Sequence, residues 1–301
     1  MNYEEFKVKL LEEIEKIYGK TAMVKIQKVL KNNGQGYDGL QMLEDSAGWI
    51  SPIVNVEELY EIYIENGLRI KLCVEWICEL LDKTRQDTTL SEFSRDVRTW
   101  EGIKEDVYPL LILTENNQEL LKTLVSTPML DMSIIYVISR KKEGREIYSV
   151  KITQAILNEY GITGEELHEQ ALKNMKKDNY RFISMDTYAK QLLQFMGIDE
   201  KRWDEHRHSP MFVLMNDSRI HGASGILDKE LLKEFAGNKN YFIFLSCIHE
   251  AIFLPDDGEL KREDVNELVA DVYRNAVSEE EQLSNHYYYY RGETGEITME
   301  L

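Results

Sequence analysis

Cys247 and His249 stand one residue apart where an apolar run ends, and they are the pair in this sequence best suited to nucleophilic chemistry. A cysteine becomes a nucleophile when a nearby imidazole stabilises its thiolate, and a carboxylate can orient that imidazole. A small buried cysteine beside a turn histidine explains the same residues, and we favour this structural interpretation. Further candidates for acid–base work are His221, Glu250, Asp256 and Asp257.

Two short segments resemble catalytic motifs without completing them. His249-Glu250-Ala251-Ile252-Phe253 begins like a zinc-protease helix, but Phe253 stands where the second histidine is required. Gly222-Ala223-Ser224-Gly225 approaches the Gly-x-Ser-x-Gly turn of serine hydrolases, but its second glycine, Gly225, comes one residue too early. Small residues of this kind more often permit close packing, so neither segment predicts an enzyme class.

Metal-ligand residue types are dense only in residues 204–208, where His206 and His208 would share one face of an extended chain. Arg207 between them favours a solvated loop, and a metal site needs three or four convergent ligands. We therefore predict no metal and no cofactor, with His206 and His208 as weak candidate ligands.

The composition is that of a globular, acidic protein. The 301 residues include 54 Asp and Glu against 36 Lys and Arg, which gives a net charge of −18. Binding a phosphate backbone requires a basic face, so nucleic acid is not an expected ligand. Residues 256–281 carry ten acids against three bases, which indicates a solvated helix face or an acidic surface for a protein partner.

The cellular compartment follows from the cysteines and the N-terminus. Cys73, Cys78 and Cys247 cannot all pair, and the first two lie five residues apart in a helical pattern that points them to different faces. Acids at Glu4 and Glu5 replace the basic region of a signal peptide, and no apolar run is long enough to span a bilayer. We expect a cytoplasmic protein that does not enter a membrane.

The first hundred residues predict a β-hairpin with packed helices. Apolar residues at helical spacing predict a helix over 3–18, and alternation predicts a strand over 23–30. Asn32-Asn33-Gly34 would turn the chain into a second strand around 40–43. Helices are expected over 57–65, 69–83 and 90–104. A polar connector at 84–89 favours two regions, 1–100 and 101–301, which could also pack as one unit.

The remaining chain alternates short apolar runs with helices. The runs are rich in β-branched and aromatic residues and predict strands at 107–113, 134–138, 147–152, 211–215, 241–246, 251–254 and 286–290. Thr163, Asp186 and Asp228 are the expected helix caps. Hairpin-length turns predict a mixed, mainly antiparallel sheet, so the fold class is α+β.

Two details of these strands bear on function. In the strand that ends at Tyr287-Tyr288-Tyr289-Tyr290, alternate tyrosines should face core and solvent, and the exposed pair could anchor a partner. His249 is expected in a turn between two paired strands, with its ring hydrogen-bonded to backbone or to Glu250.

Several segments together resemble an uncharacterised family of bacterial proteins known only as a domain of unknown function. The similarity extends from Val24 to the tyrosine strand. It rests on residues 115–117, 130–136, 165–174, 246–250 and 255–257, of which the Ile-His-Glu and Pro-Asp-Asp segments are the most specific. The resemblance implies a cytoplasmic protein of Gram-positive anaerobes and assigns no catalytic residue. A serine is common in that family where Cys247 stands, which weakens a thiol mechanism.

Two functions remain open at this point. The first is a non-catalytic binding or adaptor module that acts through protein–protein contacts of its acidic, tyrosine-rich C-terminal third. The second is a hydrolase-like enzyme that uses Cys247 and His249 with an acidic partner. Convergence of these side chains in one pocket would separate the two, because catalysis needs nucleophile and base within about 3 Å or one water.

Overall fold

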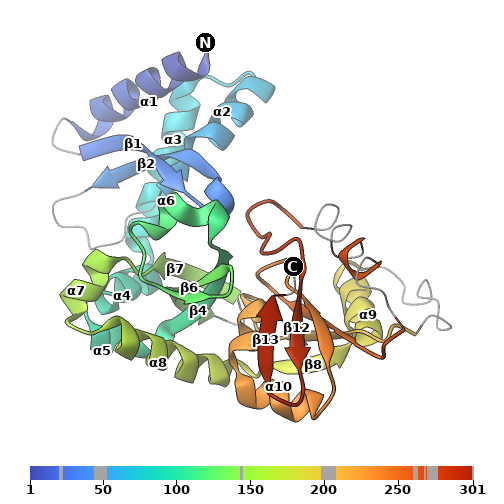
Figure 1. Cartoon of the computed structure of the whole chain (residues 1–301). Coiled ribbons are helices and arrows are strands. Elements are labelled where there is room, and N and C mark those ends of the chain that lie inside the picture. The colour runs from blue at the N-terminus through green and yellow to red at the C-terminus, as the bar shows by residue number, and fades with distance from the viewer. Residues whose placement is uncertain are drawn as a thin grey trace. The chain divides into compact units, whose positions relative to one another are not determined.

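The chain folds as an α+β protein, as the sequence predicts. The computed structural model describes residues 1–19, 23–43, 53–142, 145–197, 208–259, 264–267, 269 and 277–299. The chain divides into two compact units, residues 1–104 and 105–301 (Figure 1). Among the described residues, no helix combines the length and the apolar character needed to cross a bilayer.

The N-terminal unit is a three-stranded antiparallel sheet with helices. Its elements are α1 (Tyr3–Tyr18), β1 (Met23–Leu30), β2 (Gly36–Leu43), β3 (Ile53–Asn55), α2 (Val56–Glu65), α3 (Ile70–Gln86), α4 (Thr88–Asp96) and α5 (Trp100–Ile103). The strands lie in the order β1-β2-β3, and β1 and β2 form the predicted hairpin. Phe6, Leu10 and Ile14 of α1 pack with Leu40 of β2 and with α2 and α3 to form the core.

The first sheet of the C-terminal unit follows. It consists of β4 (Val107–Leu113), β5 (Ser126–Met129), β6 (Met132–Lys142) and β7 (Arg145–Lys151), with β6 at its centre. Helices α6 (Gln118–Leu121), α7 (Gln154–Tyr160) and α8 (Gly164–Met175) accompany it. Asn174 of α8 is buried, and its amide donates to the Val107 carbonyl at 2.9 Å, which fixes the helix against the sheet.

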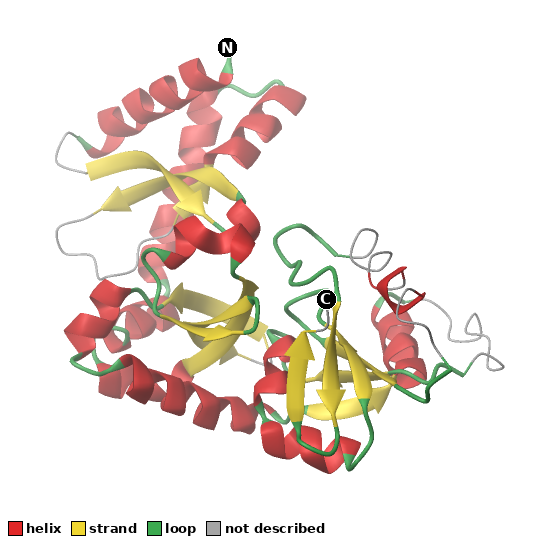
Figure 2. Cartoon of the chain, viewed as in Figure 1, coloured by secondary structure: helices red, strands yellow, loops and turns green. Residues whose placement is uncertain are grey.

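The second sheet holds the residues of functional interest. Its order is β13-β12-β10-β11-β9-β8. The strands are β8 (Arg181–Ser184), β9 (Phe212–Met215), β10 (Tyr241–Phe244), β11 (Ala251–Pro255), β12 (Tyr287–Arg291) and β13 (Glu296–Met299). Helices α9 (Met185–Phe195) and α10 (Lys229–Ala236) belong to the same region (Figure 2). Every strand pair in the described part of the chain is antiparallel.

Helix ends test the predicted caps. Thr163 forms a reciprocal capping box with Glu166, and Asp228 accepts from the first turn of α10, as predicted. The prediction for Asp186 is wrong: Ser184 caps α9 by accepting from the Thr187 amide, and Asp186 lies in the first turn. Ser184 takes this position because it is the last residue of β8 and its backbone is still extended, as an N-cap requires.

Several other elements also differ from prediction. The helix expected over 90–104 is broken into α4 and α5, because Thr99 begins a new helix by capping the amide of Gly102. The second strand starts at Gly36, directly after the turn. Strands β5, β8 and β13 had no apolar signal and were not expected.

The predicted alternation of the tyrosine strand is wrong. All four tyrosines of β12 are buried, from Tyr287 to Tyr290. Tyr287 and Tyr289 pack on Phe242 in a core that also holds Val265 and Val269, while the opposite face is covered as well. Because β12 is an internal strand with both faces covered, these rings cannot anchor a partner.

Candidate functional site

The topology of the second sheet gathers polar loops at one edge. β9 and β10 both pair antiparallel with β11, so they run in the same direction and end at the same edge. β12 pairs antiparallel with β10 and therefore begins there. We call this region the histidine edge, defined by residues 216–222, 245–250 and 277–286. Two backbone hydrogen bonds join the 245–250 and 277–286 segments: the Ile248 amide donates to the Glu281 carbonyl, and the Leu283 amide donates to the Ser246 carbonyl.

His249 is the centre of the histidine edge. Its Nδ1 accepts the backbone N–H of His221 at 3.4 Å, and its Nε2 lies 3.3 Å from a carboxylate oxygen of Glu281. It occupies the reversal between β10 and β11 that the sequence predicts, and its ring bonds to backbone, as expected. The carboxylate beside it is Glu281 rather than Glu250.

Cys247 is positioned by the same turn, but its environment disfavours a reactive thiolate. Its side chain is buried, and its sulfur accepts the backbone N–H of His249 at 3.4 Å. Burial raises the pKa of the thiol well above its ordinary range, and the negative charge of Glu250 raises it further. A thiolate nucleophile requires the opposite shift, so this environment keeps the group protonated.

A tyrosine from α9 completes this side of the edge. Burial raises the pKa of Tyr188 above its usual range, and the nearby Glu250 adds to the effect, while Arg219 opposes it. Arg219 in turn donates to Gln191 of α9 at 3.0 Å. Tyr188 and Gln191 of α9 thus contact Glu250 and Arg219 in the loops of the histidine edge.

The backbone of the 216–222 loop is strained where it meets His249. Arg219 and His221 both have left-handed conformations, with φ of 55° and 57°. The next residue, Gly222, lies so close to the His249 carbonyl that an added Cβ would stand 2.1 Å from that oxygen. The two imidazole rings are parallel, with 7° between their planes and 6.2 Å between centroids. Close packing of two loops therefore accounts for the glycine that resembles a serine-hydrolase motif.

The remaining acidic candidates lie away from this site. Asp256 and Asp257 follow the far end of β11, and a five-residue strand spans about 16 Å. Asp256 accepts the Tyr289 hydroxyl at 2.6 Å, and Asp257 accepts the Glu259 amide at 3.0 Å. Both carboxylates stabilise the opposite edge of the sheet and cannot assist His249.

The two weak metal candidates do not form a site that can be described. His208 is exposed, and its Nδ1 lies 3.4 Å from Asp186. His206 lies outside the described residues. Within the ranges that the structure describes, no three His, Cys, Asp or Glu side chains are grouped as metal ligands.

A second polar cluster at the histidine edge was not expected. Ser284 Oγ lies 3.2 Å from His286 Nδ1, and His286 Nε2 lies 3.4 Å from Asp131, outside hydrogen-bond geometry. Tyr288 donates to the same carboxylate at 2.7 Å. Ser-His-Asp is the residue set of a hydrolytic triad, but Ser284 is 0% exposed, so no substrate reaches its hydroxyl.

Sequence reasoning found the loop around His249 and named His221, whose amide binds its ring, but it did not find Glu281 or Tyr188. Glu281 and Tyr188 are far from His249 in the sequence, and no spacing rule connects residues across three loops. For Ser284 and His286 the two-residue separation is a weak signal. For Asp131, 157 residues from Tyr288, there is none.

The comparison with protein families matches nearly the whole chain. A model described as a family of unknown function, DUF5688, covers residues 3–292. The chain belongs to this family. No curated protein and no solved structure matches it. The DUF5688 match spans the histidine edge and most of both units, so the geometry of these residues is the basis for a functional proposal.

Proposed function

We propose that this DUF5688 protein is a non-catalytic binding module that docks a basic, apolar segment of a partner protein on the C-terminal end of α9. The observation that carries the proposal is the exposure of three apolar side chains there. Leu192, Phe195 and Met196 are 36%, 81% and 67% exposed and recur at helical spacing. Large apolar side chains grouped on a surface are typical of interaction sites.

The chemistry of the partner follows from charge. The chain carries a net charge of −18, so it repels acidic surfaces and attracts basic ones over the range of the Debye length. An amphipathic helix with leucine on one face and lysine on the other matches both the apolar side chains of α9 and the charge. This surface replaces the tyrosine strand as the docking candidate.

A second candidate, a hydrolase using Cys247 and His249 with an acidic partner, has one observation in its favour. Cys247, His249, His221 and Glu281 meet at the histidine edge. The buried, protonated thiol and the engaged ring nitrogens oppose it, because a nucleophile and its base must be accessible to substrate.

Thiol reactivity separates the two candidates. With iodoacetamide at about pH 8, the folded protein should be alkylated at the partly exposed Cys78, while the buried Cys247 stays unmodified. Peptide mass spectrometry reads both sites in one sample. Rapid alkylation of Cys247 in the folded protein would favour the hydrolase.

The docking surface is tested with a fluorescein-labelled amphipathic helix of leucine and lysine. Fluorescence anisotropy at physiological salt should detect binding to the parent and at least about tenfold weaker binding to Phe195→Ser. The matched control is Ile17→Ser, which removes a side chain that is 58% exposed on α1 and should leave binding unchanged. Equal loss in both variants, or none in Phe195→Ser, contradicts the proposal. So does a Phe195-dependent self-association in sedimentation, which would identify a second copy as the occupant.

A further inference from the structure

The N-terminal unit contains an open hollow between the start of α1 and the first turns of α2. It has a volume of about 330 Å³ and is lined by Tyr3, Glu57, Tyr60 and Glu61. The rings of Tyr3 and Tyr60 lie 5.2 Å apart and are tilted by 59°, and both residues line the hollow together with the two glutamates. Aromatic faces combined with carboxylates attract organic cations.

We propose that this hollow binds the cationic head of a lysine or arginine side chain on a partner polypeptide. The inference concerns the N-terminal unit alone and does not depend on the α9 surface. An anion is disfavoured by the two glutamates, and phenol rings are not preferred ligands for a hard divalent metal. A guanidinium or an ammonium uses both the ring faces and the carboxylates.

The charges around the hollow leave a negative excess. Glu57 accepts from Lys28 at 3.4 Å and from the backbone N–H of Asp38 at 3.3 Å, so it is held in place but only partly neutralised. For the Glu61 carboxylate, the described part of the chain provides no ion pair and no hydrogen bond. The carboxylates of Glu4, Asp38, Glu57, Glu58 and Glu61 outnumber the ammonium groups of Lys7, Lys28 and the N-terminal Met1.

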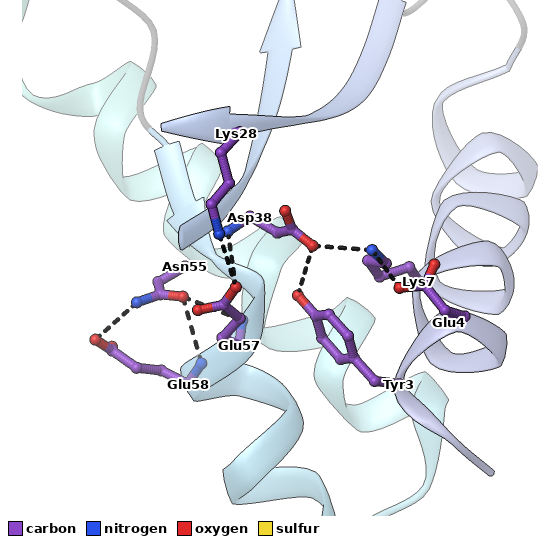
Figure 3. A network of polar contacts seen from close by, with 8 residues as sticks. All are labelled: Tyr3, Glu4, Lys7, Lys28, Asp38, Asn55, Glu57 and Glu58. Carbon is purple, nitrogen blue, oxygen red and sulfur yellow. Dashed lines mark hydrogen bonds and ion pairs between the residues drawn. The ribbon is translucent and has the colours of Figure 1, made fainter. Parts of the chain in front are cut away.

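One ammonium group of the protein, that of Lys7, already lies beside a tyrosine ring and a carboxylate of this region. Lys7 Nζ lies 4.7 Å from the centroid of the Tyr3 ring, and it donates to Asp38 at 2.9 Å. Tyr3 donates its hydroxyl to the same carboxylate at 3.0 Å, which fixes the ring (Figure 3). Lys7 thus already makes, with the Tyr3 ring and a carboxylate, the kind of contact that we assign to a partner's side chain in the hollow.

A preformed wall lowers the cost of binding. Tyr60 is held by a hydrogen bond to the Met1 carbonyl at 3.0 Å and by contact with Phe6, whose centroid is 5.2 Å away. Neither ring needs to be ordered when a ligand arrives. An open hollow of this kind holds one side chain weakly, and the backbone on either side of that side chain supplies further contacts at the rim.

The test uses Gly-Ser peptides that carry one central lysine, arginine or citrulline, titrated against the full chain by ligand-observed saturation-transfer NMR. Lysine and arginine peptides should bind, whereas citrulline, which has the shape of arginine without its charge, should not. Glu61→Gln should weaken binding by about two- to fivefold, and Glu57→Gln/Glu61→Gln should abolish it.

The matched control is Glu65→Gln, which makes the same charge change on the same helix outside the hollow. Equal weakening by Glu61→Gln and Glu65→Gln would indicate non-specific attraction and overturn the assignment. Binding of citrulline would overturn it as well. Free lysine and arginine amides form a further arm, and equal affinity for amide and peptide would show that the hollow takes a small cation rather than a polypeptide. None of these outcomes bears on Phe195, so failure here leaves the α9 proposal to its own test.

Discussion

Replacing His249 by alanine tests whether the histidine edge is structural. The change removes the acceptor for the His221 amide and the contact with Glu281, at 3.4 and 3.3 Å. Both distances are long, so each interaction belongs at the lower end of about 0.5–1.5 kcal/mol. The strained His221 also loses a restraint. We expect the free energy of unfolding of this region to fall by about 1–2 kcal/mol.

Hydrogen exchange measured by mass spectrometry is the suitable assay, because two compact units need not unfold together. Peptides covering 241–255 should exchange about five- to thirtyfold faster in His249→Ala, while peptides of the N-terminal unit stay unchanged. His249→Asn, whose amide oxygen can accept the His221 N–H, should recover part of the protection. His208→Ala is the matched control, since its side chain is 86% exposed.

A different outcome would refute the structural interpretation. If His249→Ala exchanged like the parent and also lost a hydrolytic turnover that the parent possesses, the ring would be a catalytic base. The same loss in Cys247→Ala at unchanged stability would point to a thiol mechanism despite the burial of that side chain.

Three further changes test other parts of the description. Gly222→Ala should lower the free energy of unfolding by about 1–3 kcal/mol, because the new methyl group meets a carbonyl oxygen at 2.1 Å. Urea unfolding followed by circular dichroism measures the loss, and a neutral result would disprove the close packing. Tyr288→Phe should cost about 1–2 kcal/mol through the lost bond to Asp131 at 2.7 Å, read by the same transition. Lys7 holds the pKa of Asp38 below its usual range, so the folded state favours the charged carboxylate; this stability is present above the unfolded pKa of about 3.9 and is lost as the pH falls through the lowered folded value. In Asp38→Asn, the free energy of unfolding of the N-terminal unit should therefore fall less steeply as the pH is lowered. An unchanged pH dependence would contradict the lowered pKa of Asp38.

The long apolar elements were predictable because burial on both faces leaves a strong signal. The run over 107–113 matches β4 residue for residue, since five of the seven side chains of that strand are buried and the other two are half-buried. β13 and β8 gave no such signal, because their side chains are only half-buried or exposed. β12 was located correctly but given the wrong exposure, since four tyrosines suit a half-exposed strand as well as an internal one.

The candidate site divides along the same line. The turn at His249 was predictable because apolar runs of similar length flank it and leave only a few residues for the reversal. Its partner Glu281 was not predictable, since the two meet only through the pairing of the 277–286 segment with the loop after β10. The order of strands in a sheet is a property of the whole unit, and no local pattern encodes it.

Backbone strain gives the strongest physical reason to interpret the histidine edge as structural. A left-handed conformation costs a non-glycine residue about 1–2 kcal/mol, and both Arg219 and His221 adopt it. Something must offset that cost. The His221 amide donates to His249, its carbonyl lies 3.5 Å from the Tyr180 hydroxyl, and Arg219 reaches α9 through Gln191. These contacts occupy the polar groups that a catalytic site would leave available for substrate, so the strain at this edge is explained by the joining of its loops.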